Sequence, residues 1–152
     1  MTMFLPVKLP IFLRILVEKI VPQALREIGI AEGKCHLVGY SLAGLGALYM
    51  AYHSNVFSSI ASVSGALWYP KFVDYVRGHS LPATVERVYL SLGDKEQKTR
   101  NPYMSRVQEA TELIYNHLTQ SGVKAIFELN PGNHFKDEVF RIANCVHWIL
   151  NE

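Results

Sequence analysis

A short segment around Ser41 constrains the fold of this chain more than any other. Residues 36–44 read His-Leu-Val-Gly-Tyr-Ser-Leu-Ala-Gly, an apolar strand that ends at the serine and continues into helix-like sequence. This pattern is typical of a nucleophile elbow, a sharp strand-to-helix turn that holds a serine in a strained backbone conformation. Strand and helix approach each other closely there, so the positions two before and two after the serine must be small. Gly39 and Ala43 meet this requirement, and Gly44 follows. We therefore predict a nucleophile at Ser41, against the alternative that the small residues only allow a helix to pack on a sheet.

Two further strands end beside an acidic residue and a histidine. Residues 88–93 read as a buried strand that runs into a loop holding Asp94 and Glu96. Residues 123–129 read as another strand, and His134 follows it. Serine, acid and histidine is the chain order of an α/β-hydrolase triad, and open α/β sheets bind their ligands beyond the carboxyl ends of the strands. We therefore expect the three side chains to meet at that edge.

Strand and helix patterns alternate along the whole chain. This alternation predicts an α/β fold, with a mostly parallel sheet of about four strands and helices on both faces. The sequence contains no repeats or interdomain linkers, so we expect a single domain over residues 1–152. The expected strands are 35–40, 59–63, 87–92 and 123–129; the expected helices are 11–27, kinked or restarted at Pro22, then 43–53, 71–77, 102–120 and 136–150.

Four motifs support a family resemblance. They are Gly39-Tyr40-Ser41-Leu42-Ala43-Gly44-Leu45, Ser64-Gly65-Ala66-Leu67-Trp68, Leu92-Gly93-Asp94-Lys95-Glu96 and Pro131-Gly132-Asn133-His134-Phe135. Together they resemble the putative-esterase branch of the α/β-hydrolase superfamily, which includes enterochelin (siderophore) esterases and esterase D-like enzymes. The similarity runs from about residue 16 to residue 150. It implies hydrolysis of a small-molecule carboxylic ester by a serine nucleophile, with no metal and no organic cofactor.

The resemblance also implies roles for individual residues. Ser41 would be the nucleophile and His134 the base, whose ordinary pKa near neutrality suits it to accept and return a proton. The acid would be Glu96 or Asp94. We favour Glu96, three positions after the glycine that ends the strand, while Asp94 would brace the turn. The backbone amide of Leu42 would donate to the oxyanion.

Three aromatic residues are candidates for contact with the substrate. Trp68 and Tyr69 follow a strand on the expected ligand side of the sheet, where they would line a pocket, and Tyr40 adjoins the serine. Core packing is an equally good interpretation of the Trp68 and Tyr69 pair. The sequence does not identify the acyl or alcohol part of the ester.

The region before Ser41 departs from the fold that the motifs resemble. Several strands would normally precede the nucleophile, and a loop after one of them supplies half of the oxyanion hole. Here only about forty residues precede Ser41, and they read as one helix. We therefore interpret the chain as the C-terminal half of the fold, with an unpaired hydrophobic strand edge open to self-association. An alternative to an active esterase is a non-catalytic hydrolase remnant, or a half that needs a partner chain.

The composition limits which cellular compartment and which classes of binding partner we expect for this chain. A formal net charge of +2 gives no reason to expect nucleic acid as a partner. Cys35 and Cys145 are expected to be buried thiols rather than a disulfide, which favours a reducing, cytoplasmic location. The apolar stretch 4–21 is interrupted by charged residues and lacks a small-residue cleavage site, so we expect neither a membrane span nor a signal peptide.

Overall fold

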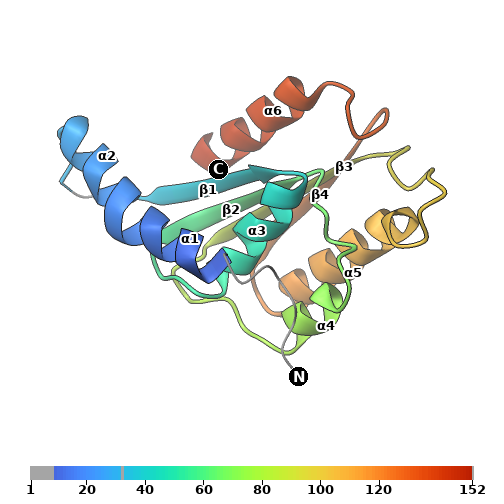
Figure 1. Ribbon diagram of the computed structural model, residues 1–152, viewed down its shortest axis with the longest axis horizontal. Coiled ribbons are helices and arrows are strands. Elements are labelled where there is room, and N and C mark those ends of the chain that lie inside the picture. Colours follow the sequence, from blue (N-terminus) through green and yellow to red (C-terminus); the bar gives the residue numbers. More distant parts are fainter. Residues whose placement is uncertain (1–8, 32, 152) are drawn as a thin grey trace.

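The computed structural model describes residues 9–31 and 33–151. These residues form a parallel four-stranded sheet in the order β1-β2-β3-β4, flanked by helices (Figure 1). The strands are β1 (Cys35–Tyr40), β2 (Phe57–Val63), β3 (Arg87–Gly93) and β4 (Lys124–Asn130). The helices are α1 (Leu9–Ile15), the π-helix η1 (Leu16–Ile20), α2 (Val21–Glu27), α3 (Leu42–Ala51), α4 (Phe72–Arg77), the 3-10 helix η2 (Met104–Arg106), α5 (Val107–Gln120) and α6 (Glu138–Asn151). The predicted α/β architecture is confirmed.

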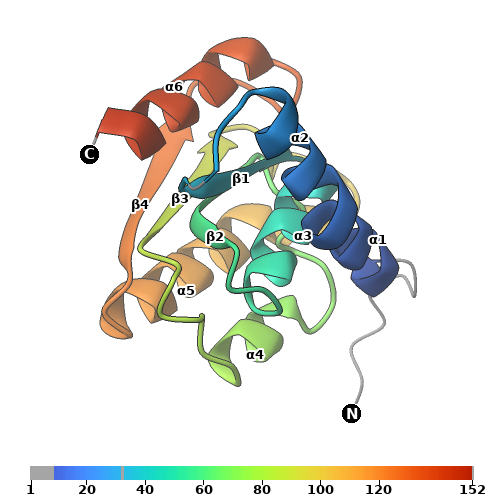
Figure 2. The ribbon, with the colours of Figure 1, turned by 90° about the vertical axis from the view of Figure 1, so that its left-hand side faces the viewer.

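Helices cover both faces of the sheet. Helix α6 lies on one face, whereas α3, α4 and α5 lie on the other (Figures 1 and 2). Successive residues of a strand point to opposite faces, so Ile60 of β2 joins the larger core with α3 and α5 while Ala61 packs beneath α6. The smaller core also holds Cys145 and Trp148 of α6. Both cores are apolar, which fixes the strand register and therefore the positions of the strand ends.

The strand register brings the four carboxyl ends to one edge of the sheet. Tyr40 of β1 lies opposite Val63 of β2, which in turn lies opposite Ser91 of β3. Gly93, the last residue of β3, lies opposite Asn130 of β4. The loops that follow β1, β2, β3 and β4 therefore begin side by side, and they carry the predicted site residues.

The N-terminal helical segment is continuous but changes its helical form before Pro22. The predicted helix 11–27 is observed as α1, η1 and α2, and Pro22 lies in the first turn of α2. Proline has no N–H to donate, and its ring crowds the carbonyl four residues earlier. The π-helix η1 directly precedes this proline, and the N–H of Val21 bonds to the carbonyl of Leu16, five residues earlier. The predicted restart at Pro22 is thus a local change of helical pitch.

The predicted helix over 102–120 begins later than expected. Asn101 accepts hydrogen bonds at its side-chain oxygen from the backbone N–H groups of Tyr103 (2.9 Å) and Met104 (3.2 Å). These bonds offer the backbone a turn in place of the first helical turn. A 3-10 helix follows, and the α-helix itself starts at Val107.

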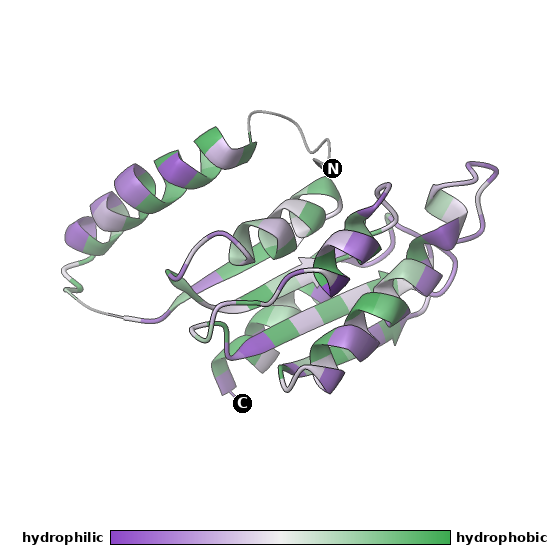
Figure 3. Cartoon of the chain, turned by 90° about the horizontal axis from the view of Figure 1, so that it is seen from below, coloured by the Kyte–Doolittle hydropathy of each residue, from purple (hydrophilic) through white to green (hydrophobic). Residues whose placement is uncertain are grey.

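Strand β1 lies at the edge of the sheet formed by the described residues. On its open side, α1 runs beside α3 rather than pairing with the strand (Figure 3). An apolar groove of about 430 Å³ lies between these elements. It is lined by Leu9, Phe12, Leu16, Leu37, Val38, Leu42, Ala43, Leu45, Gly46, Ala47 and Met50. The predicted open hydrophobic edge is present in this part of the chain.

Both cysteines are free thiols. Cys145 is fully buried, and this burial raises the pKa of its thiol to about 11. Cys35 is only half-buried, because it opens the edge strand β1. In the described ranges, no helix is both long and apolar enough to cross a membrane.

Candidate active site

Ser41 occupies the sharp turn between β1 and α3. Its backbone angles are φ 58° and ψ −121°, a region that residues with a side chain rarely adopt. The surrounding backbone holds this conformation. The N–H of Ser41 donates to the carbonyl of Val63 (3.0 Å), and its own carbonyl accepts from Gly44 and Ala66 (3.0 Å each). The strained conformation directs the side chain away from both elements, as the sequence predicts for an elbow.

Two glycines permit the close approach at this turn. A Cβ atom on Gly39 would lie 2.1 Å from the carbonyl oxygen of Ala43, and one on Gly44 would lie 2.9 Å from Ser62 Oγ. Ala43 is itself exposed. The predicted requirement for a small residue at Ala43 stays a prediction. The side chain of Ala43 points outward, so Gly44 makes the close contact with β2.

Substitution of Gly39 should therefore be poorly tolerated. We expect Gly39→Ala to lower the free energy of unfolding by about 3 kcal/mol or more, because the clashing atom belongs to the backbone and cannot rotate away. Gly46→Ala is the matched control, since its new Cβ would lie 3.7 Å from Leu9 Cδ1, an ordinary contact. Urea unfolding compares the two variants, and equal stabilities would contradict this account of the turn.

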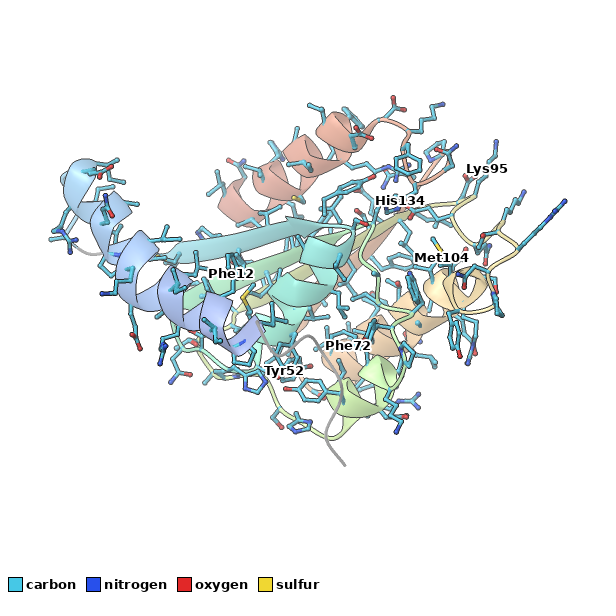
Figure 4. All side chains as sticks on the ribbon, viewed as in Figure 1. Phe12, Tyr52, Phe72, Lys95, Met104 and His134 are labelled. Atoms are coloured by element: carbon cyan, nitrogen blue, oxygen red, sulfur yellow. The ribbon has the colours of Figure 1, made fainter. Side chains whose placement is uncertain are left out.

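The three predicted side chains meet in one chain of hydrogen bonds. His134 Nε2 lies 3.0 Å from Ser41 Oγ, and His134 Nδ1 lies 2.7 Å from Glu96 Oε2. An ionised carboxylate only accepts hydrogen bonds, so Nδ1 carries the proton in the neutral imidazole and Nε2 accepts from the serine hydroxyl. His134 lies at the same end of the sheet as Met104 (Figure 4). The arrangement can move a proton from the serine to the imidazole.

Glu96, rather than Asp94, lies against the imidazole. Its side chain is 5% exposed, and its second oxygen, Oε1, accepts hydrogen bonds from the backbone N–H of Gly93 (2.6 Å) and from Ser64 Oγ (2.7 Å). Asp94 instead accepts the backbone N–H of Gly132 at 2.7 Å. Asp94 thus joins the loop after β3 to the loop that carries the histidine. The sequence suggests such a bracing contact for Asp94.

The cavity beside Ser41 is small. It has a volume of about 80 Å³ and is lined by Ser41, Ser64, Gly65, Ala66, Trp68, Glu96, Met104, Val107 and His134. Trp68 is therefore placed where the sequence suggested. Tyr69 is not in this lining, but lines a neighbouring pocket of about 350 Å³ that also contacts Trp68. Met104 and Val107 were not foreseen, because the sequence around them shows only the start of an amphipathic helix.

Tyr40 ends β1 and lies against the loop that carries His134. Its hydroxyl donates to the backbone carbonyl of His134, and the two rings lie 5.3 Å apart. Burial raises the pKa of Tyr40, so the phenol keeps the proton that this bond requires. Tyr40 is absent from the lining of the cavity next to Ser41. Tyr40 therefore holds the histidine loop, and a contact between Tyr40 and the substrate stays a prediction.

Leu42 is the first residue of α3, and the residue is 61% exposed. The first N–H groups of a helix have no partner within that helix. The Leu42 amide is thus free of the helix's own hydrogen bonds, in the position where the sequence predicts an oxyanion donor. No group of three or more His, Cys, Asp or Glu residues that could hold a metal ion occurs within residues 9–31 and 33–151.

A family match identifies the family of this chain. A family model described as Putative esterase matches residues 10–139, and the chain belongs to this family. It is 23% identical to the uncharacterized protein YbbA of Bacillus subtilis over 122 residues, which is 76% of this chain and 49% of that protein. The chain thus spans about half the length of this curated relative.

Solved structures show the same fold. The enterochelin esterase of Shigella flexneri matches 93% of this chain with 38% of its own, at a TM-score of 0.71 and 18% identity. The siderophore hydrolase EstA of Aspergillus nidulans matches 92% of this chain with 56% of its own, at a TM-score of 0.68 and 19% identity. At these identities the likeness establishes an α/β-hydrolase type of fold, of which this chain covers a part.

Proposed function

We propose that this chain is a serine-dependent carboxylic ester hydrolase in which Ser41 is the nucleophile, His134 the base and Glu96 the acid. The observation that carries the proposal is the unbroken hydrogen-bond chain from Ser41 through His134 to Glu96, at 3.0 and 2.7 Å. The strained backbone at Ser41 and the family membership support it.

The mechanism follows from the positions of these groups. Ser41 Oγ attacks the ester carbonyl carbon as its proton passes to His134 Nε2, and Glu96 stabilises the resulting imidazolium. The amide of Leu42 donates to the negative oxygen of the tetrahedral intermediate. His134 then protonates the departing alcohol, which leaves an acyl group on Ser41. Water, deprotonated by His134, then attacks the acyl carbon. The bond from that carbon to Ser41 Oγ breaks, His134 returns the proton to Oγ, and the carboxylic acid leaves.

The substrate class is a small-molecule ester. The enterochelin esterase and the siderophore hydrolase share the fold, and by their names one acts on enterochelin and the other on siderophores. Trp68 lines both the cavity beside Ser41 and the larger neighbouring pocket, so its side chain adjoins any acyl or alcohol group bound at Ser41. Two free thiols suit a reducing compartment, and we place the reaction in the cytoplasm, with neither nucleic acid nor membrane as a partner.

A fluorophosphonate probe tests the proposal directly. The probe reacts with a serine only when a neighbouring base activates it, so we expect about one label per chain, located on Ser41 by mass spectrometry of the digested protein. Denatured protein is the control, because it retains the serine but loses the base. A folded chain that remains unlabelled would overturn the proposal.

The choice of acid has its own test. We expect Glu96→Ala to lower kcat for a p-nitrophenyl ester by about 10²-fold or more, because the imidazole loses the group that orients it and stabilises its charge. Asp94→Ala removes only the bond to the Gly132 amide and should cost about tenfold or less. The comparison is made by steady-state kinetics on folded variants, and a larger loss for Asp94→Ala would reverse the assignment.

A second candidate is a hydrolase half that is inactive until a partner chain completes it. Two observations favour it: the chain spans 49% of the relative YbbA, and β1 lies at an open sheet edge in the described residues. Loss of one oxyanion donor costs about 10²–10³ in kcat in a well-studied protease. This candidate predicts that the isolated chain folds with the same site geometry but reacts with the probe far more slowly than complete esterases do.

A further inference from the structure

Arg141 is a fully buried arginine in a helix whose inner face is otherwise apolar. It belongs to α6 and is 0% exposed, on the same helix as the buried Cys145, Trp148 and Ile149. A buried guanidinium is costly unless a countercharge and hydrogen-bond acceptors surround it. The cost indicates that something other than hydrophobic packing keeps an arginine at this position.

The guanidinium of Arg141 contacts both the acid Glu96 and the loop that carries His134. Nη1 donates to Glu96 Oε1 (3.1 Å) and to Ser64 Oγ (2.9 Å), whereas Nη2 donates to the backbone carbonyl of Asn133 (3.0 Å). Asn133 immediately precedes His134 in the chain. One planar group therefore contacts the acid directly and contacts the backbone next to the base.

These contacts determine how the carboxylate is presented to the imidazole. Glu96 Oε1 accepts from the Gly93 amide, from Ser64 and from Arg141, so Oε2 is the oxygen left for His134 Nδ1. The Nη2 hydrogen bond to the Asn133 carbonyl holds the loop that carries the imidazole. The Tyr40 hydroxyl holds the same loop one residue later, at the carbonyl of His134. A lysine has a single donor centre and cannot span both contacts, whereas the guanidinium fork can.

We propose that Arg141 is a positioning residue: it holds the Glu96 carboxylate and the His134 loop in register so that the acid orients the base. This inference rests on the proposed esterase function for its effect on rate. The hydrogen bond between His134 and Glu96, however, exists in the resting protein and can be measured without any substrate.

The experiment compares Arg141→Met and Arg141→Lys with Arg87→Met. Arg87 is a half-buried arginine at the start of β3, at the opposite end of the sheet, where Nη1 contacts the carbonyl of Ile149 at 3.4 Å. The three variants and the wild type are compared by urea unfolding, by kcat and KM for p-nitrophenyl butyrate, and by the far-downfield proton NMR signal of His134 Nδ1–H.

We expect folded Arg141→Met to lose the downfield signal and about 10²-fold in kcat, with KM within about twofold, because a displaced acid affects the chemical step more than binding. Arg141→Lys should retain the signal in weakened form and lose about tenfold in kcat, since it keeps the charge but only one contact. Arg87→Met should leave the signal and kcat unchanged.

Each other outcome has a defined meaning. A folded Arg141→Met variant that keeps the downfield signal overturns the positioning role, even if kcat falls. A wild type without esterase activity whose signal is lost in Arg141→Met overturns the proposed function and leaves the positioning role intact. If neither Arg141 variant folds, NMR of the guanidinium protons in the wild type decides the matter. Slow rotation and slow exchange support the role, whereas rapid rotation overturns it.

Discussion

Replacement of Ser41 by alanine should lower hydrolysis of short-chain p-nitrophenyl esters by roughly 10³-fold or more, to the level of the buffer. The hydroxyl is the atom that forms the acyl-enzyme, and its loss leaves only the weak effect of the surrounding dipoles on direct attack by water. The backbone of the turn is held by the hydrogen bond from the Ser41 N–H to the Val63 carbonyl and by those that the Ser41 carbonyl accepts from Gly44 and Ala66, so the variant should fold normally. Steady-state rates, with folding checked by circular dichroism, measure the effect. Ser121→Ala, an exposed serine beyond the end of α5, is the matched control.

His134→Ala should lower the same rate nearly as far, because a serine without its base remains protonated at neutral pH. Residues that act as one unit do not add their effects, so the Ser41→Ala, His134→Ala double variant should be little worse than Ser41→Ala alone. Wild-type activity in Ser41→Ala would mean that a contaminant or another site performs the reaction, and would contradict the role of Ser41.

Much of the site follows from sequence because it depends on strand ends. In a parallel sheet every strand ends at the same edge, so any residue that directly follows a buried strand can be placed there without knowing how the helices pack. Ser41, Glu96 and His134 each lie within a few residues of such an end. The proximity of Ser41 and His134 is therefore predictable from the sequence, although 93 residues separate them in the chain.

The contacts that complete the site were beyond sequence reasoning. Arg141 lies 45 residues from Glu96, on a helix that reaches the site only by packing across the sheet, and helix packing is not fixed by strand order. A lone charge on the inner face of an amphipathic helix is the signal that would have marked it. The contact of Gly44 with β2 has a similar origin, because which small residue faces β2 depends on the pitch and entry angle of α3.

The isolated chain should not be a stable monomer at tens of micromolar. Edge strands with unpaired backbone groups are templates for association, and β1 carries no acidic residue and no lysine or arginine to prevent it. The apolar groove beside β1 adds hydrophobic surface, with Phe12 49% exposed and Leu42 61% exposed. Burial stabilises by roughly 25 cal/mol per Å², so pairing of two such edges, or of two N-terminal helices, is favourable. Sedimentation velocity should show dimers or larger species.

A charge placed in the groove tests whether this surface is the cause. Phe12→Lys should shift the sedimentation profile toward monomer, because association would bury an unpaired ammonium group among aliphatic side chains. Ile28→Lys is the matched control: this residue is 64% exposed and does not line the groove, so the oligomeric state should remain that of the wild type. A wild-type chain that sediments as one monomeric species and unfolds cooperatively would contradict the predicted association through β1. It would show that the N-terminal helix is sufficient to protect the sheet edge.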